Sequence, residues 1–218
     1  MVTMLELEPY LSQLPQWPHQ GRHVLAQHDA ASIVVYQAFR PGIADEAVTL
    51  QRFGAAFSRS RMSWIKPNFL WMMYRSGWAT KVDQERVLAI RIRRAFFESL
   101  LLEAVPSSFL PKHHPSRADW QTAVSRSEVR LQWDPDHNPG GSPVQRRALQ
   151  LGLRGRLLEE YSSAAILGIL DVTEFARAQR SNAHPPYASL MLPSERVFLP
   201  QAKAASERAG IDSSPPSP

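Results

Sequence analysis

The segment Ser60–Trp78 brings together side chains of the types that bind nucleotides. Cationic and hydroxyl side chains precede a predicted helix, and the free backbone N–H groups and dipole at a helix start favour an anion. Tryptophan and tyrosine close by could stack on a base or a nicotinamide ring. The same pattern also fits a core helix with aromatic packing and solvated charges. The candidate nucleotide- or anion-binding residues here are Arg61, Ser63, Trp64, Lys66, Asn68, Tyr74 and Arg75.

Two further places carry polar side chains at predicted strand ends. Arg40 follows the first strand and could hold a phosphate or a ribose, although an arginine at a strand end also occurs without a function. The run 132–137 contains Gln132, Asp134, Asp136 and His137, which could supply a general base or metal ligands. No second cluster with ligand spacing accompanies this run. The sequence therefore favours a turn in which the two aspartates bond backbone N–H groups, and no metal site is predicted.

Alternating or β-branched apolar residues predict the strands that would position these side chains. The predicted strands are 32–38, 85–93, 128–134, 147–153, 164–172 and 197–199. Helices are expected between them, including one that starts at Pro67 and is capped by Gly77. The predicted helices are 5–14, 43–51, 67–76, 95–105, 156–161 and 173–179, with Thr173 as the cap of the last.

These elements lack regular βαβ spacing, which favours an α+β fold. We expect a compact single domain of short mixed or antiparallel strands with interleaved short helices. The chain is predicted to divide into an irregular lead-in (1–28), one α+β domain (29–200) and a disordered tail (201–218) that is rich in Ala, Ser and Pro.

Composition excludes several classes of protein. The 218 residues include no cysteine, so disulfides, thiolate metal sites and cysteine nucleophiles are ruled out. No apolar run approaches the roughly 20 residues that cross a bilayer. We therefore expect a cytoplasmic protein without a membrane partner. The formal net charge of +5 favours an anionic partner, such as a nucleotide or nucleic acid. Phosphate-binding glycine loops of the P-loop and Rossmann types are absent.

Long strings of residues identify a family resemblance that spans roughly residues 32–180. The chain resembles the uncharacterised family known as domain of unknown function 4291. This resemblance identifies the family, which has no settled activity to transfer. The strings are Gln37–Pro41, Ser60–Trp78, Glu85–Ile90, Val129–His137 and Leu149–Gly155.

The order of elements also looks like that of ADP-ribosyltransferase-type domains. In that superfamily the bound molecule is NAD, and a late acidic residue or glutamine acts at the ribose. This layout implies an ADP-ribosyltransferase-like enzyme with NAD as the cofactor, in which Arg40 and the region 63–74 bind and Gln132 or Asp134 is catalytic. The alternative is a non-catalytic nucleic-acid-binding module that uses the interleaved basic and aromatic residues.

Overall fold

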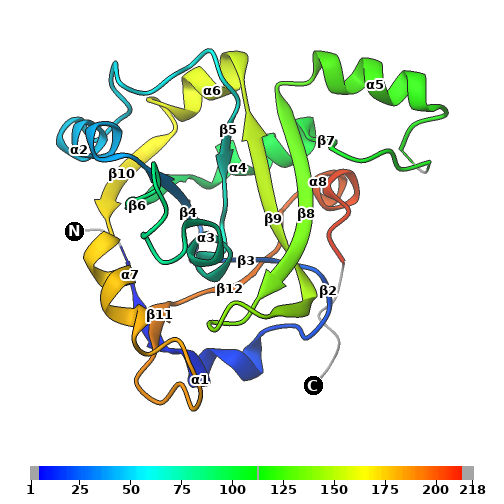
Figure 1. Ribbon diagram of the computed structural model, residues 1–218. Coiled ribbons are helices and arrows are strands. Elements are labelled where there is room, and N and C mark those ends of the chain that lie inside the picture. The colour runs from blue at the N-terminus through cyan, green and yellow to red at the C-terminus, as the bar shows by residue number, and fades with distance from the viewer. Residues whose placement is uncertain (1–4, 112, 213–218) are drawn as a thin grey trace.

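The computed structural model describes residues 5–111 and 113–212. Its long strands form two sheets, which stand side by side in Figure 1 with helix α3 between them. The first sheet is antiparallel and has the order β10-β6-β4. Its strands are β4 (Ser32–Phe39), β6 (Arg86–Arg93) and β10 (Ile166–Asp171).

The second sheet is built on the long antiparallel hairpin of β8 (Val129–His137) and β9 (Pro143–Leu153). The short strand β7 (Val105–Pro106) pairs in parallel with β8. The other edge of β9 carries two short strands, β5 (Ser63–Ile65) in antiparallel and β2 (Gly21–Arg22) in parallel orientation.

Two small ladders connect segments near the two ends of the chain. Strand β1 (Leu7–Pro9) pairs with β11 (Met191–Pro193), and β3 (Val24–Ala26) pairs with β12 (Arg196–Phe198). The predicted helix 5–14 is therefore wrong for its first half, because residues 7–9 are extended and only a short helix follows.

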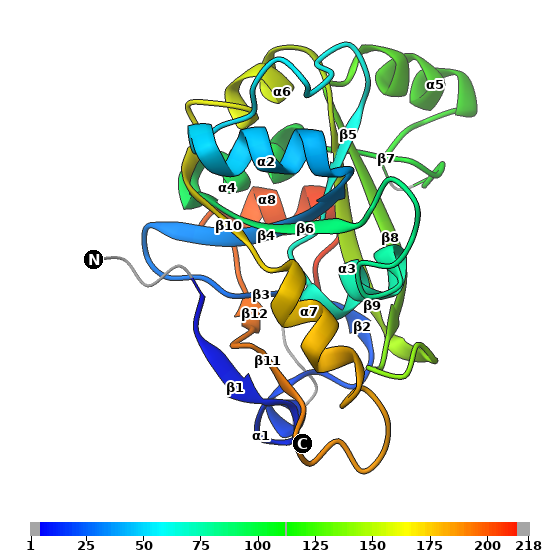
Figure 2. The same ribbon diagram turned by 60° about the vertical axis from the view of Figure 1, so that its left-hand side comes forward.

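Eight α-helices lie within the described residues, and Figure 2 shows α2, α4 and α6 on one side of the first sheet and α3 and α7 on the other. No helix in this part of the chain is both long and apolar enough to cross a membrane. The helices are α1 (Tyr10–Gln13), α2 (Pro41–Leu50), α3 (Phe69–Ser76), α4 (Arg94–Glu103), α5 (Arg117–Arg126), α6 (Gly155–Tyr161), α7 (Thr173–Arg180) and α8 (Lys203–Ala209), with a 3₁₀ turn at Leu14–Gln16.

The first sheet separates two hydrophobic cores because successive strand residues point to opposite faces. Val35 and its cross-strand partner Ile90 face the core that contains α2, α4, α6 and α8. Tyr36 and its partner Ala89 face the core that contains α3 and α7. Both faces are thus buried, which is why strands β4 and β6 have near-continuous apolar sequences.

The α+β class with interleaved helices is confirmed, and most strands fall where the alternation predicted them. The tail is different: residues 203–209 form α8, whose Ala205 and Ala209 are buried against the core. Residues 213–218 of the predicted tail lie outside the described part. Helix α5 was not predicted, since its sequence has no apolar face and none of its residues is buried.

Three boundaries were also predicted incorrectly. The capping residue of α3 is Asn68, whose side chain accepts a hydrogen bond from the Trp71 backbone N–H, so Pro67 precedes the helix. The Thr173 hydroxyl accepts from the Val87 backbone N–H instead of capping α7. Strand β8 continues to His137, with an irregularity in register after Pro135 that accommodates the missing N–H.

Candidate functional site

A backbone bridge joins the first sheet to the chain just after strand β5 of the second sheet. The backbone groups of Tyr36 in β4 and Lys66 after β5 exchange two hydrogen bonds, of 2.7 and 3.2 Å. Helix α3 begins three residues after Lys66. The backbone at Lys66 is therefore fixed by a strand pairing on one side and by a helix start on the other.

A cleft of about 470 Å³ lies beside this bridge. Its volume is in the range of small-molecule sites, roughly 300–1,000 Å³. Side chains from β4, β5, α3, β8 and β9 line it, so residues far apart in the sequence meet there. Its polar side chains are Gln37, Ser63, Lys66, Arg75, Gln84, Gln132, Asp134 and Gln150, and its aromatic ones are Phe39, Trp64 and Trp71.

Gln37 joins the two walls of the cleft. Its Nε2 donates to the Ser63 Oγ at 2.8 Å and to the Trp64 carbonyl at 3.1 Å, both on β5. Its Oε1 accepts from the buried Tyr161 hydroxyl at 2.7 Å. Because both the Nε2 and the Oε1 of this buried amide have hydrogen-bond partners, Gln37 holds β5 at a fixed distance from β4.

Asp134 is held on the opposite wall by two amides. The Gln132 Nε2 donates to its Oδ1 at 2.8 Å, and the Gln150 Nε2 donates to its Oδ2 at 2.6 Å. The two glutamines face each other across the β8–β9 ladder, which places both amides beside the carboxylate. Because each amide donates to only one lone pair of an oxygen, both oxygens keep further lone pairs for a ligand.

Lys66 is the most unusual charged group of the cleft, with only 7% of its surface exposed. Burial, and secondly repulsion by Arg75, lower its pKa to about 8 against the opposing attraction of Asp134. Arg75 lies over the Trp71 ring, 6.0 Å from its centroid, at the exposed rim of α3. The cleft thus carries two cationic side chains facing one carboxylate.

The N-terminus of α3 is already occupied by a carboxyl group from the same chain. Glu195 is buried, and its Oε1 accepts from the Phe69 backbone N–H at 2.6 Å while its Oε2 accepts from the Asn68 Nδ2 at 3.0 Å. Burial raises the pKa of Glu195 to about 8, against the opposing effect of these two donors. The expectation that this helix start binds an external anion is corrected accordingly.

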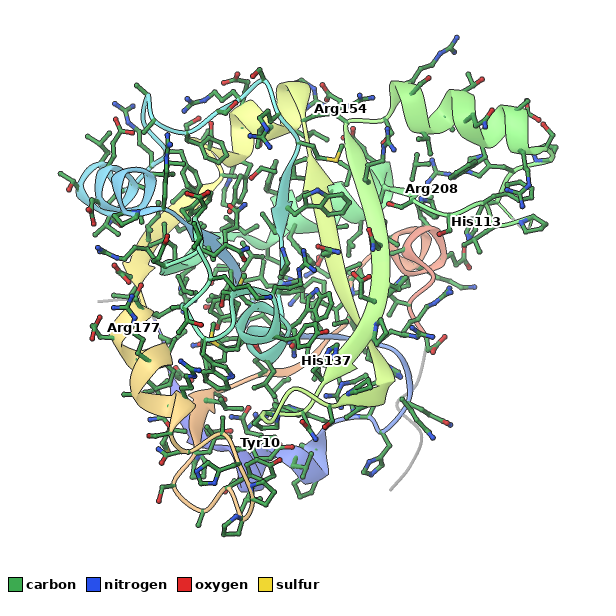
Figure 3. All side chains as sticks on the ribbon, viewed as in Figure 1. Tyr10, His113, His137, Arg154, Arg177 and Arg208 are labelled. Carbon is green, nitrogen blue, oxygen red and sulfur yellow. The ribbon has the colours of Figure 1, made fainter. Side chains whose placement is uncertain are left out.

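Aromatic rings form a ledge next to the cleft. Tyr74 stacks on His137 with 3.5 Å between the ring centroids, and the Trp71 ring lies nearly parallel to both rings. Figure 3 labels His137 beside α3. On the cleft wall Trp64 pairs with Gly152 of β9. A Cβ atom at Gly152 would lie 2.9 Å from the Trp64 ring, so the glycine makes room for the indole.

Sequence comparison addresses the identity of the chain. The model of the family described as Domain of unknown function (DUF4291) matches residues 23–198. The chain belongs to this family. No curated protein matches the sequence. The matched span of the DUF4291 family includes every residue that lines the cleft, and also Glu195, which holds α3 in place.

Six of the ten candidate site residues line this DUF4291 cleft: Ser63, Trp64, Lys66, Arg75, Gln132 and Asp134. The other four lie elsewhere. Arg40 is exposed at the start of α2, and Arg61 is exposed outside the cleft lining. Asn68 caps α3, and Tyr74 belongs to the aromatic ledge.

The run Asp134–His137 does not form the predicted turn. Asp136 makes a buried ion pair with Arg146, in which Arg146 Nε lies 2.7 Å from its Oδ2. Only one of its oxygens bonds a backbone N–H, that of His137. Among residues 5–111 and 113–212, no group of three or more His, Asp or Glu side chains is placed to hold a metal ion.

Sequence reasoning missed Gln37, Gln150 and Glu195. Gln37 gave one signal, a polar residue at the end of an otherwise apolar strand. Gln150 and Glu195 gave none, because their partners Asp134 and Phe69 lie 16 and 126 residues away in the chain.

Proposed function

We propose that the cleft binds a nucleotide, with NAD as the candidate, and that the chain is an ADP-ribosyltransferase-like enzyme. One observation carries the proposal: a single cleft gathers two cations, two indoles and an amide-held carboxylate. A nucleotide requires the same three kinds of partner, for its phosphates, its rings and its ribose hydroxyls.

Roles follow from the chemistry of each group. Arg75 can form paired hydrogen bonds with a phosphate, and Lys66 adds a second positive charge deeper in the cleft. Trp64 and Trp71 offer ring faces for the base or the nicotinamide, a contact that contributes roughly 1–3 kcal/mol per base. Asp134 accepts hydrogen bonds from ribose hydroxyls through its remaining lone pairs.

Asp134 also suits the chemical step of ADP-ribosyl transfer. The bond between the ribose C1 and the nicotinamide nitrogen breaks, and its electron pair leaves with the nicotinamide. Positive charge then develops on the ribose, where a fixed carboxylate stabilises it. An acceptor nucleophile or water forms the new bond to C1 and loses its proton.

The layout supports NAD over other nucleotides by analogy with ADP-ribosyltransferase-type domains. Strands of two sheets and a helix line the cleft, and the late strand β8 supplies a carboxylate and a glutamine. In this chain the end of the first long strand contributes Gln37 to the cleft in place of Arg40.

The nucleic-acid-binding alternative needs an open basic surface. Four of the eight cations between residues 61 and 94 are instead engaged with carboxylates of the same chain. Arg86 pairs with Asp45 and Asp171, and Arg94 pairs with Glu98. Arg91 and Arg93 form ion pairs as well. These pairings favour the hypothesis of a nucleotide-binding cleft.

A thermal-shift screen at two salt concentrations separates the two hypotheses. The ligands are NAD, ADP-ribose, ATP, GTP and a short single-stranded oligonucleotide. A ligand at 100 times its dissociation constant stabilises the protein by about 2.7 kcal/mol, which shifts the midpoint clearly. A salt-tolerant shift with NAD supports the enzyme. A shift with the oligonucleotide alone, lost at high salt, contradicts it.

A further inference from the structure

Lys66 is buried without a carboxylate partner. Across the described residues its Nζ makes no ion pair within 4 Å, and the hydrogen bond of this atom is a long contact of 3.4 Å to the Trp64 carbonyl. Lysines are almost never this buried unless they are paired. The nearest charged groups in the cleft are Arg75 from α3 and Asp134 from β8.

Burial and a neighbouring guanidinium are the two features that make a lysine amine nucleophilic, because both disfavour its protonated form. Their combined effect brings the pKa of Lys66 to about 8. At pH 7 an amine with this pKa is unprotonated about 200 times more often than an ordinary lysine with a pKa of about 10.4.

We propose that Lys66 is a covalent nucleophile of the cleft, which condenses with the carbonyl group of a small phosphate-bearing aldehyde or ketone. The Nζ lone pair attacks the carbonyl carbon and forms a carbon–nitrogen bond. The carbonyl oxygen then leaves as water with the two hydrogens of the amine, and an imine remains. No oxidant or reductant is consumed.

The surroundings of Lys66 match such a ligand. Arg75 at the rim supplies the cation for a phosphate, and Asp134 can take the proton released when the lysine ammonium becomes neutral. The two backbone hydrogen bonds between Lys66 and Tyr36 fix the position of the Lys66 backbone. A fixed backbone helps to hold the amine in position for attack on a bound carbonyl group. Imine formation at Lys66 does not depend on nucleotide binding, because it requires only the Lys66 amine, Arg75 and Asp134.

The lysine content of the chain makes the test clean. The sequence has four lysines: Lys66, Lys81, Lys112 and Lys203. Lys81 is exposed and donates to the Arg75 carbonyl at 2.7 Å, and Lys203 is exposed beside Glu207. Lys203 is therefore a matched internal control for a solvated amine.

The experiment treats the whole chain at pH 7 with pyridoxal 5′-phosphate, an aldehyde that bears a phosphate. Borohydride then reduces any imine, and peptide mass spectrometry locates the label. We expect Lys66 to be labelled at least ~10-fold faster than Lys203. This lower bound is conservative, because the unprotonated fraction of the amine at pH 7 differs by more than this factor. Pyridoxal without the phosphate should label Lys66 more slowly, because Arg75 then has no anion to bind.

Variants and pH sharpen the result. Lys66→Arg should abolish the fast label, whereas Lys203→Arg should leave it unchanged. The labelling rate should rise with a midpoint near pH 8, and Arg75→Ala should move this midpoint upwards. Equal labelling of Lys66 and Lys203, or label on the exposed lysines alone, overturns the proposal. If Lys66→Arg does not fold, the map of the wild-type protein still decides.

Discussion

Replacing Lys66 with methionine should make the protein more stable at pH 7, although it removes a central residue of the cleft. Methionine has a similar length and no charge, so it can occupy the same buried space. Because burial and Arg75 lower the pKa of Lys66 from 10.5 to about 8, a charged Lys66 costs the fold about 3 kcal/mol at pH 7. The variant does not carry this cost.

The pH dependence gives the sign of the effect. Between pH 8 and 10.5 the unfolded chain binds a proton at Lys66 that the folded protein has lost, so wild-type stability rises with pH in this window. Below pH 8 both states are charged, and the full cost is present. The advantage of Lys66→Met should therefore be largest at pH 7 and should vanish near pH 10.5.

Urea unfolding of both proteins at pH 7 and pH 10 measures this difference. A gain of about 3 kcal/mol corresponds to a rise of roughly 6–12 °C in melting temperature for a protein of this size. Lys203→Met serves as the control at an exposed site and should change stability by less than about 0.5 kcal/mol. A variant that is less stable at pH 7, or a difference that does not depend on pH, refutes the reasoning.

Three other substitutions test the supports of the cleft. Burial raises the pKa of Glu195 to about 8, so wild-type stability should fall by at most about 5 kcal/mol as pH rises from about 4.5 to 8. Urea titrations at several pH values should show that Glu195→Gln removes this fall. Asp136→Ala leaves Arg146 buried without its partner and should cost about 3–5 kcal/mol in the same assay, and a smaller loss would mean that water solvates the guanidinium. Gly152→Ala should displace the Trp64 indole and change its fluorescence while the protein stays folded, and an unchanged spectrum would contradict the close contact.

The strands of the framework were predictable because each has a clear local pattern. Val129, Leu131 and Trp133 alternate with polar residues, and β4 and β6 are rich in β-branched residues. The end of β8 was not predictable in the same way. Pro135 normally ends a strand, but an irregular register at this point lets the hairpin continue to His137.

The site was predictable in its charged and aromatic members but not in its supports. Lys66, Arg75 and Asp134 attract attention by type, whereas glutamines such as Gln150 acquire a role only when the chain folds. Glu195 shows why local reasoning about the helix start failed, since the carboxyl group that occupies it comes from 126 residues further along the chain. The tail was misjudged for a related reason, because α8 is held by packing against α4 and has little local signal of its own. The single α+β domain at residues 29–200 stays a prediction.

Calorimetric titration of NAD into the wild-type protein, Arg75→Ala and Arg61→Ala tests the central claim most directly. The two arginines are both exposed, but only Arg75 lines the cleft. We predict that NAD binds, that Arg75→Ala weakens binding roughly 10- to 100-fold through the loss of a charged hydrogen bond, and that Arg61→Ala leaves it unchanged. If NAD does not bind, or if Arg61→Ala weakens binding as much as Arg75→Ala does, the cleft is not a nucleotide site.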